Sequence, residues 1–253
     1  MTYTKGKVSV IIPVYNSERF IRETILSALR QTYKNVEIIV VDDYSSDLSA
    51  EIIQDLQKEY SNIRYHLQPT NYGAGVARNK ALEIATGQFI AFLDSDDVWH
   101  PEKLEKQLSL IEKRKSAFSY TAIEMIDEKG EIIKGKRSVR KECTYNFLLK
   151  NTMIATSSVV VDRAFFGDFR MSDRRGGQDY ATWLMLLRSG CLACGIDEAL
   201  VKYRVRKGSL SSNKFESIKQ VWEIQVQDEK INKIASSYYV CCFIINALRK
   251  HFL

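Results

Sequence analysis

Residues 89–97 read Phe-Ile-Ala-Phe-Leu-Asp-Ser-Asp-Asp, an apolar run that ends in three carboxylates within four residues. An apolar run of this length, bounded by turn residues, predicts a buried strand, as in a parallel sheet. Because side chains alternate along an extended backbone, Asp94 and Asp96 can point the same way while Ser95 turns aside. Two like charges this close repel each other unless water or a cation relieves them. Hard oxygen ligands suit Mg²⁺ or Mn²⁺, and a solvated acidic turn that caps the next helix is the alternative.

The sequence before this stretch alternates apolar strands with amphipathic helices. The predicted strands are 8–13, 36–41, 62–67 and the one from 89. Four strands that alternate with three helices predict right-handed crossovers and an open, doubly wound, mostly parallel α/β sheet. Ligands of such sheets bind at the carboxyl ends of the strands, where the strand order reverses. The turns that contain Asn16, Asp43 and Asp96 all lie at those ends, so acidic loops follow two of the four strands.

The pattern changes near residue 116, where the predicted elements become shorter and more varied. They are a hairpin of 117–127 with 131–134, a short helix at 143–150, a strand at 157–161, a helix after Asp179 and a polar-faced helix at 214–235. Asn16 or Ser17 is expected to cap the first helix of the chain, and residues 45–47 the second. We predict a domain of residues 1–210, with halves 1–115 and 116–210, followed by a helical extension, 211–253.

Composition limits the class of protein. The 253 residues are 45% hydrophobic and 27% charged, which fits one large domain or one domain with a small appendage. Residues 1–201 hold 27 Lys/Arg and 27 Asp/Glu, whereas 202–253 hold 10 and 4, so the net charge of +6 is C-terminal. A basic tail favours an acidic partner such as anionic lipid, nucleic acid or a phosphorylated substrate. Five cysteines and three scattered histidines do not form a zinc pattern, and we expect reduced thiols in a cytosolic protein. We expect neither a signal peptide nor a membrane span.

Four segments, taken in order, resemble the family-2 inverting glycosyltransferases. They are residues 8–16 (Val-Ser-Val-Ile-Ile-Pro-Val-Tyr-Asn), 40–47 (Val-Val-Asp-Asp-Tyr-Ser-Ser-Asp), 71–79 and 94–97. The resemblance covers roughly residues 7–210 and implies the glycosyltransferase-A fold, which binds nucleotide sugars. It also implies that half 1–115 binds the nucleotide sugar and half 116–210 the acceptor. The later segments 203–204 and 209–214 are similar to members that build bacterial surface polysaccharides.

The resemblance implies a set of donor-binding residues at the first two strand ends. Pro13, Val14 and Tyr15 match the segment that lines the nucleotide base, and the Tyr15 ring would stack on the base. Packing of that ring under the sheet edge is the alternative. Asp43 matches the acid that accepts the imide N–H of the base, a charge-assisted bond that favours uracil. Arg78 matches a basic residue near the base and the phosphates, although a surface arginine on a helix is also compatible with the sequence.

The resemblance also implies that residues of the acidic loop 94–97 bind the nucleotide sugar and its metal. Asp94 matches the acid that is directed to the ribose, and Ser95 beside it is counted with the nucleotide-sugar-binding residues. Asp96 matches the acid that holds Mn²⁺ or Mg²⁺ on the diphosphate. The leaving group is a nucleoside diphosphate, and a divalent cation would neutralise the charge that develops on it.

On the acceptor side, Asp179 matches the general base, because an inverting transfer needs one carboxylate to remove the hydroxyl proton. A helix cap is the structural alternative for Asp179. Three positions depart from the family: Gln178 replaces a Glu, Tyr44 stands where Gly is frequent, and Arg206 stands where relatives commonly carry His. Because arginine cannot bind a cation, we expect Arg206 or its neighbour Lys207 to contact the pyrophosphate directly, or else to lie in a solvated basic loop.

These features predict a metal-dependent, inverting glycosyltransferase of hexosyltransferase type that uses a UDP-sugar. The expected acceptor is a lipid-linked saccharide at the inner face of a bacterial plasma membrane, in capsule, O-antigen or exopolysaccharide assembly, with no nucleic acid as partner. A sugar nucleotidyltransferase would need a Gly-rich basic loop after the first strand, which residues 13–17 do not form. A non-catalytic scaffold would be expected to lose carboxylates. A dinucleotide oxidoreductase would need a third glycine after Gly73 and Gly75.

The C-terminal residues 238–248 are mainly apolar and precede Arg249 and Lys250. As a helix they would reach about 16 Å, roughly half of the ~30 Å hydrocarbon core, so they cannot span a membrane. We expect this segment to bind an anionic membrane surface peripherally. Packing against its own domain, or against a second subunit in a homodimer, is the alternative.

Overall fold

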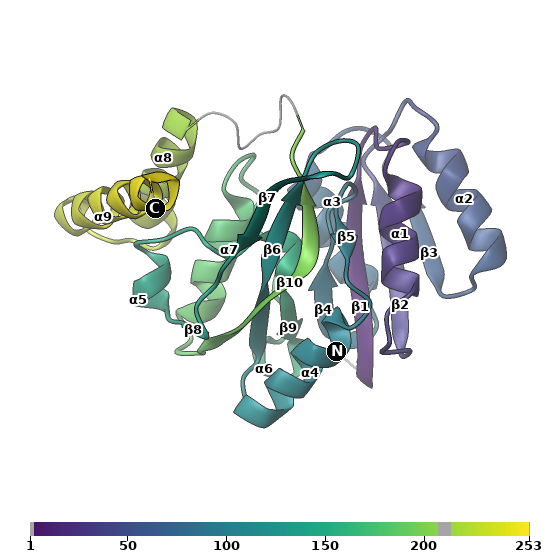
Figure 1. Ribbon diagram of the computed structural model, residues 1–253, viewed down its shortest axis with the longest axis horizontal. Helices are drawn as coiled ribbons and strands as arrows, with labels where there is room; N and C mark the ends of the chain where they lie inside the picture. The colour runs from purple at the N-terminus through teal and green to yellow at the C-terminus, as the bar shows by residue number, and fades with distance from the viewer. Residues whose placement is uncertain (1–2, 207–213, 253) are drawn as a thin grey trace.

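One ten-stranded sheet runs through the part of the chain that the structure, a computed structural model, describes, residues 3–206 and 214–252 (Figure 1). Its first half consists of β1 (Thr4–Val14), α1 (Ile21–Leu29), β2 (Val36–Asp42), α2 (Ser49–Glu59), β3 (Ile63–Leu67), α3 (Ala74–Ile84) and β4 (Gly87–Phe92). β1 pairs in parallel with β2 and β4, and β2 with β3, which gives the order β3-β2-β1-β4. The predicted doubly wound arrangement is confirmed, and the strand order reverses beside β1.

The second half extends the sheet with mixed pairing. Its elements are β5 (Val98–Trp99), α4 (Lys103–Arg114), β6 (Phe118–Ile126), β7 (Ile132–Arg137), β8 (Glu142–Cys143), α5 (Tyr145–Leu148), η1 (Thr156–Ser158), β9 (Val160–Asp162), α6 (Arg163–Phe166), α7 (Gln178–Leu187) and β10 (Ala193–Arg204). β9 pairs antiparallel with both β4 and β6, and β10 runs parallel to β6. The predicted hairpin is confirmed as β6 and β7. The strand expected at 157–161 begins only at residue 160, because 156–158 form a 3₁₀ turn.

Alternate residues of β1 fill the core on the two faces of the sheet. Val10 and Ile12 join a cluster with Ile25 of α1, whereas Ile11 joins a second cluster with Ala77 of α3. Helices therefore cover both faces, which explains why the strands read as unbroken apolar runs rather than as an alternating pattern. The acidic loop 94–97 follows β4, the strand after the reversal, and so lies where ligands of such sheets bind.

The cap predicted for the first helix is wrong. α1 begins at Ile21, with Phe20 at the N-cap position and no side-chain cap. Instead, the Ser17 carbonyl accepts the N–H groups of Phe20 and Ile21, and Asn16 Oδ1 accepts the Ser46 N–H at 2.9 Å. The loops after β1 and β2 thus contact each other. The Asn16 side chain, which the sequence predicted as a helix cap, makes this contact instead.

The single helix predicted at 214–235 is also wrong. The chain forms α8 (Lys214–Glu223), a π-helical turn, η3 (Ile224–Asp228), and then a long α9 (Lys233–Phe252), with Lys230 at φ 55 between them. Figure 1 shows α8 and α9 beside α5 at one end of the molecule. Val240 of α9 is buried in the core cluster of α7, so this helix packs on its own domain along one face. Over the residues described, we find no helix with the length and apolarity to cross a bilayer.

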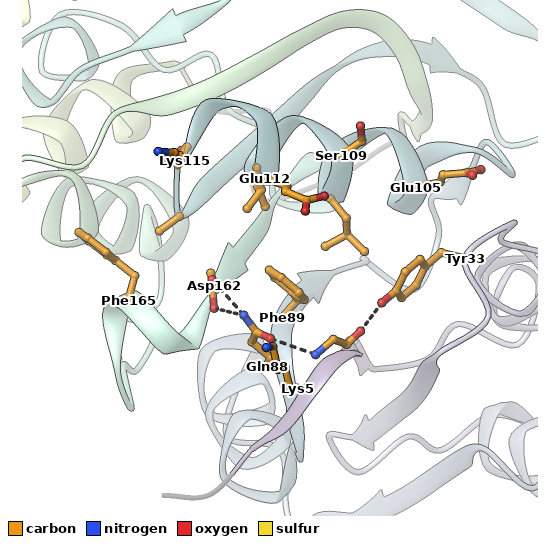
Figure 2. Close-up of a pocket in the computed structure, with 15 residues that line it drawn as sticks. Lys5, Tyr33, Gln88, Phe89, Glu105, Ser109, Glu112, Lys115, Asp162 and Phe165 are labelled. Atoms are coloured by element: carbon orange, nitrogen blue, oxygen red, sulfur yellow. Dashed lines mark hydrogen bonds between the residues drawn. The ribbon is translucent and has the colours of Figure 1, made fainter.

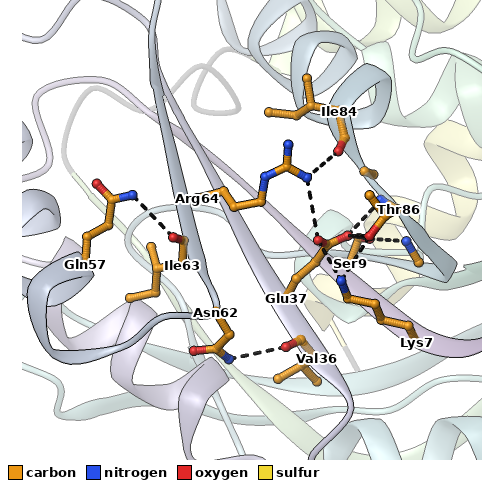
Figure 3. Close-up of polar contacts among 12 residues, drawn as sticks. Lys7, Ser9, Val36, Glu37, Gln57, Asn62, Ile63, Arg64, Ile84 and Thr86 are labelled. Carbon is orange, nitrogen blue, oxygen red and sulfur yellow. Dashed lines mark hydrogen bonds and ion pairs between the residues drawn. The ribbon is translucent and has the colours of Figure 1, made fainter. Parts of the chain in front are cut away.

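A buried carboxylate, Glu37, ties strands together well away from the carboxyl ends (Figure 3). It accepts hydrogen bonds from Ser9 Oγ at 2.5 Å, from the Thr86 N–H at 2.7 Å and from Lys7 Nζ at 3.0 Å. Burial opposes ionisation, but these bonds together keep the pKa of Glu37 below its usual value. Glu37 therefore has the contacts of a structural anion that joins β1, β2 and the start of β4.

Candidate active site

The three acids of the loop 94–97 have different surroundings. Asp97 is buried, and its two oxygens accept Ser157 Oγ at 2.5 Å and the Arg204 N–H at 2.8 Å. Burial, together with the charges of Asp96 and Asp94, raises the pKa of Asp97 well above its usual value. Asp97 therefore fixes the loop to η1 and β10 and faces protein on all sides.

Asp94 and Asp96 each pair with an arginine from a distant part of the chain. Arg78 Nη2 of α3 lies 2.5 Å from Asp94 Oδ1, and Arg206 Nε lies 2.7 Å from Asp96 Oδ2. The side chains of the two acids are 28% and 15% exposed, so both remain accessible. Burial raises the pKa of Asp96, Arg206 lowers it and Asp94 raises it again. The structure thus brings Arg78, Asp94, Asp96 and Arg206 together, with Arg206 paired to Asp96, whereas Lys207 lies outside the described residues.

Backbone and buried side chains hold this loop in place. Ser95 is nearly buried and its Oγ lies 2.7 Å from Ser17 Oγ. Arg204 donates from Nε to the Asp96 carbonyl at 2.8 Å and from Nη2 to Glu23 at 2.8 Å. The sequence reasoning missed the roles of Arg204 and Ser157. The signal for Arg204 was its place in the Tyr-Arg pair at 203–204, which matched the family without pointing to a partner.

The carboxylates of the loop 94–97 suit a divalent cation that is also bound by the diphosphate of a ligand. Mg²⁺ is usually held by one or two carboxylates and by phosphate oxygens of the substrate, and hard oxygen ligands suit Mn²⁺ as well. Asp96 offers one accessible carboxylate, one oxygen of which is paired with Arg206. Among the described residues no cluster of three or more His, Cys, Asp or Glu side chains is placed to hold an ion by itself. The residues therefore fit a metal only when the ligand supplies most of the coordination.

Asp179 lies in the first turn of α7, where Gly177, at φ 69, occupies the N-cap position. The alternative of an Asp179 cap is therefore wrong. Its Oδ2 accepts Thr156 Oγ1 at 3.3 Å, and its Oδ1 accepts the Tyr180 N–H at 2.8 Å. Burial raises the pKa of Asp179, and the bond from Tyr180 and the charge of Arg78 oppose this rise. A raised pKa brings a carboxylate closer to the range of a general base at neutral pH.

Gln178 connects the two sides of the site. Its Oε1 accepts Arg78 Nη1 at 3.3 Å, while the same guanidinium binds Asp94 through Nη2. The side chain also packs on Gly75, where an added Cβ would lie only 2.9 Å from it. Because Gln178 is neutral, Asp94 is the ion-pair partner of Arg78 at this position.

The ends of β1 and β2 carry the predicted base-binding residues. Val14 pairs in register with Asp42, so Tyr15 and Asp43 follow neighbouring strand ends. Tyr15 is 51% exposed, and the alternative in which its ring packs under the sheet edge is wrong. Pro13 and Val14 are buried, and the Val14 carbonyl accepts the Asp43 N–H at 2.7 Å.

The Asp43 carboxylate fixes the turn before α3. It accepts Gln68 Nε2 at 2.7 Å, the Tyr72 N–H at 2.8 Å and the Gly73 N–H at 2.7 Å. An ionised carboxylate has about four lone-pair sites, so three bonds leave capacity for one more donor. Asp43 thus has a structural role, and it retains one acceptor position for a ligand.

A separate concave surface of about 730 Å³ lies at the opposite edge of the sheet (Figure 2). Lys5 and Gly6 at the start of β1 line it, together with Gln88 at the start of β4 and Phe165 of α6. Lys5, Gly6 and Gln88 come from the amino ends of parallel strands, and residues of α4 and α6 complete the lining. None of the predicted site residues lines this surface, so it is distinct from the candidate site.

The fold and the acidic carboxyl edge together define an α/β protein of the glycosyltransferase-A class. Residues 9–176 match the family model described as "Glycosyl transferase family 2", and the chain belongs to this family. It is therefore a glycosyltransferase, as the sequence predicted.

Two curated relatives resemble nearly the whole chain. TuaG of Bacillus subtilis (strain 168), which carries the name of a teichuronic acid biosynthesis glycosyltransferase, is 39% identical over 250 residues, covering 99% of each chain. WfgD of Escherichia coli is named UDP-Glc:alpha-D-GlcNAc-diphosphoundecaprenol beta-1,3-glucosyltransferase. It is 39% identical over 249 residues, which cover 96% of this chain and 94% of WfgD.

Solved structures share the fold at lower identity. TarS 1-349 of S. aureus in complex with UDP superimposes with a TM-score of 0.69 at 21% identity, covering 94% of this chain and 70% of TarS 1-349. The mannosyltransferase PcManGT of Pyrobaculum calidifontis, in complex with GDP-Man and Mn²⁺, has a TM-score of 0.69 at 16% identity, covering 96% and 73%. At these identities the likeness shows the fold alone.

Proposed function

We propose that this glycosyltransferase moves a sugar from a UDP-sugar, with inversion, to a hydroxyl of a lipid-linked saccharide during assembly of a bacterial surface polysaccharide. The proposal rests on one observation: over the described ranges, acids with an arginine partner and an acid without one lie at the same carboxyl edge of the sheet. Asp94 and Asp96 pair with arginines, whereas among the described residues Asp179 accepts hydrogen bonds from Thr156 and from the Tyr180 N–H alone. Residues 1–115 would bind the donor, and residues 116–210 would contribute most of the acceptor side.

On the acceptor side, Asp179 would accept the proton of the attacking hydroxyl. It is partly exposed, forms no ion pair with an arginine in the part of the chain that the structure describes, and has a pKa raised by burial. These are the properties of a carboxylate that can take up a proton as the new glycosidic bond forms. Thr156 and the start of α7 would hold the carboxylate in position.

On the donor side, charge would be stabilised on the departing diphosphate. Arg78 and Arg206 present fixed guanidinium groups beside Asp94 and Asp96, and such preorganised donors act most strongly where charge develops. A bound Mn²⁺ or Mg²⁺, held by Asp96, would supply further neutralisation of the diphosphate. Asp43 and the exposed Tyr15 ring would receive the uracil base.

The relatives support the substrate class. The printed name of WfgD states a UDP-glucose donor and a diphosphoundecaprenol-linked acceptor, and that of TuaG states teichuronic acid biosynthesis. The metal in the PcManGT complex is in keeping with a divalent cation. A nucleotidyltransferase lacks support because no Gly-rich basic loop follows β1. The ion pairs of Asp94 with Arg78 and of Asp96 with Arg206 argue against a non-catalytic scaffold.

A screen of nucleotide sugars for transfer or hydrolysis, with Mn²⁺ and with excess chelator, tests the proposal. Asp179→Asn keeps the size of the side chain and cannot accept a proton, so we expect kcat to fall by about 10²–10⁴ with UDP affinity unchanged. Asp173→Asn, an exposed acid before α7, is the matched control. A parallel loss of UDP affinity in Asp179→Asn would place Asp179 on the donor side, and full activity in chelator would exclude the metal.

The protein would meet its acceptor at the cytoplasmic face of the plasma membrane, bound through α9. Residues 230–253 contain four Lys/Arg and no Asp or Glu. Ile234, Tyr238 and Ile245 of α9 are 86%, 57% and 50% exposed and recur at helical spacing on one side. A basic helix with an exposed apolar stripe favours peripheral binding to anionic lipid.

A further inference from the structure

Arg137, the last residue of β7, is a partly buried cation that has no anionic partner within residues 3–206 and 214–252. Seven arginines in the described part of the chain are not exposed, and six of them pair with a carboxylate: Arg78, Arg163, Arg170, Arg174, Arg204 and Arg206. Arg137 instead makes one hydrogen bond, from Nη2 to the Met153 carbonyl at 3.2 Å. Burial lowers the pKa of Arg137, and no carboxylate charge offsets this effect.

An uncompensated guanidinium in this setting is costly to the fold. Removing a cation from water is unfavourable unless a paired anion restores the lost interaction. The side chain is still partly accessible, so an anion from solution can reach it. The absence of a protein carboxylate leaves the five N–H donors of the guanidinium largely free for a ligand.

The position of Arg137 places it beside the acceptor side of the site. Met153, which it binds, lies three residues before Thr156, and Thr156 binds Asp179. Arg137 pairs in register with Ile123 of β6, and Ile123 pairs with Val201 of β10, two residues before Tyr203. Burial raises the pKa of Tyr203, and the loop acids 94–97 and Asp179 raise it further, so Tyr203 lies within reach of all these charges.

We propose that Arg137 binds the diphosphate of the lipid-linked acceptor, while Arg78 and Arg206 serve the diphosphate of the donor. The inference rests on the proposed function, because it assumes that Asp179 marks the acceptor side. An acceptor that carries its diphosphate on the sugar next to the reactive hydroxyl presents an anion within a short distance of the base. The planar guanidinium matches phosphate oxygens in a bidentate manner, which a lysine does not reproduce. Arg137 is thus a specificity residue that selects diphosphate-linked acceptors over neutral saccharides.

The test measures binding of geranyl diphosphate, a soluble isoprenyl diphosphate, by calorimetry on the full chain saturated with UDP and Mn²⁺. We expect Arg137→Gln to weaken this binding at least tenfold and Arg137→Lys to weaken it less, with UDP affinity unchanged in both. Arg140→Gln, which removes an exposed arginine three residues later, is the matched control and should stay within twofold of wild type. Circular dichroism checks the fold, and Arg137→Lys keeps the test valid if Arg137→Gln fails to fold.

Three results would overturn the inference: no binding of geranyl diphosphate to the wild type, equal binding to Arg137→Gln, or a matching loss of UDP affinity. The last result would assign Arg137 to the donor. The UDP titration by itself reports on the proposed function. If UDP does not bind, geranyl diphosphate is titrated with Mn²⁺ alone, and binding that Arg137→Gln weakens would then contradict that function and keep the diphosphate site.

Discussion

Tyr44 has a backbone conformation that residues with an L side chain rarely adopt, with φ at 68, and the residue is 57% exposed. A residue other than glycine in the left-handed conformation destabilises the folded state by roughly 1–2 kcal/mol. Glycine removes this strain, but it loses more chain entropy on folding, which offsets about half of the gain. We therefore expect Tyr44→Gly to raise the free energy of unfolding by a few tenths to about 1 kcal/mol in urea titrations. Lys115→Gly, at φ 50 behind α4, should give a similar gain. A less stable Tyr44→Gly would show that the ring contributes packing.

Asp97 shows why single residues of the site were only partly predictable. The sequence presents three acids in one loop, and alternation along the strand suggested that Asp94 and Asp96 act together. Nothing local separates Asp97 from them, because its partners Ser157 and Arg204 lie 60 and 107 residues further along the chain. The same holds for Arg137. It is distinguished by having no carboxylate partner among the described residues, and no local pattern in the sequence can show this.

At the scale of elements, the strands were the predictable part. Apolar runs between turn residues marked β1, β2 and β4, because helices bury both faces of these strands. The C-terminal helices were not predictable in this way. The polar-faced pattern of 214–235 runs on without Gly or Pro, and the break at Lys230 follows from packing of α8 and α9 on the domain.

The exposed stripe of α9 gives a prediction at this scale. The double variant Ile234→Asp, Tyr238→Asp places charge where the helix would enter the lipid, so we expect binding to phosphatidylglycerol vesicles to fall at least tenfold. Phe165→Asp is the matched control, since Phe165 is 59% exposed on α6 at the amino edge of the sheet. Sedimentation at low and high salt measures the effect. Unchanged sedimentation of the double variant would exclude the stripe as the membrane contact, and a loss of dimer in solution would assign it to a subunit interface.

At the scale of the whole molecule, a stabilising network and the candidate site lie at different parts of the sheet. The hydrogen bonds of Glu37 join β1, β2 and the residue before β4, whereas the candidate site lies beyond the carboxyl ends of these strands. Glu37→Gln keeps the shape of the side chain and loses charge-assisted bonds that contribute about 1.5–3 kcal/mol each at most. We therefore expect a less stable protein at pH 7 with kcat and donor KM unchanged.

The pH dependence of this variant follows from the pKa of Glu37, which the fold lowers below the usual 4.5. A lowered pKa means that the folded state prefers the ionised acid, so its stabilisation is complete above the unfolded pKa and is lost as the pH falls through the folded pKa. The difference in unfolding free energy between wild type and Glu37→Gln should be constant from pH 7 to about pH 5.5 and should shrink below about pH 4.5. Urea titrations at pH 7, 5.5, 4.5 and 3.5 would measure it. A difference that persists undiminished at the lowest pH would mean that Glu37 stabilises the sheet through its shape and neutral hydrogen bonds rather than through its charge.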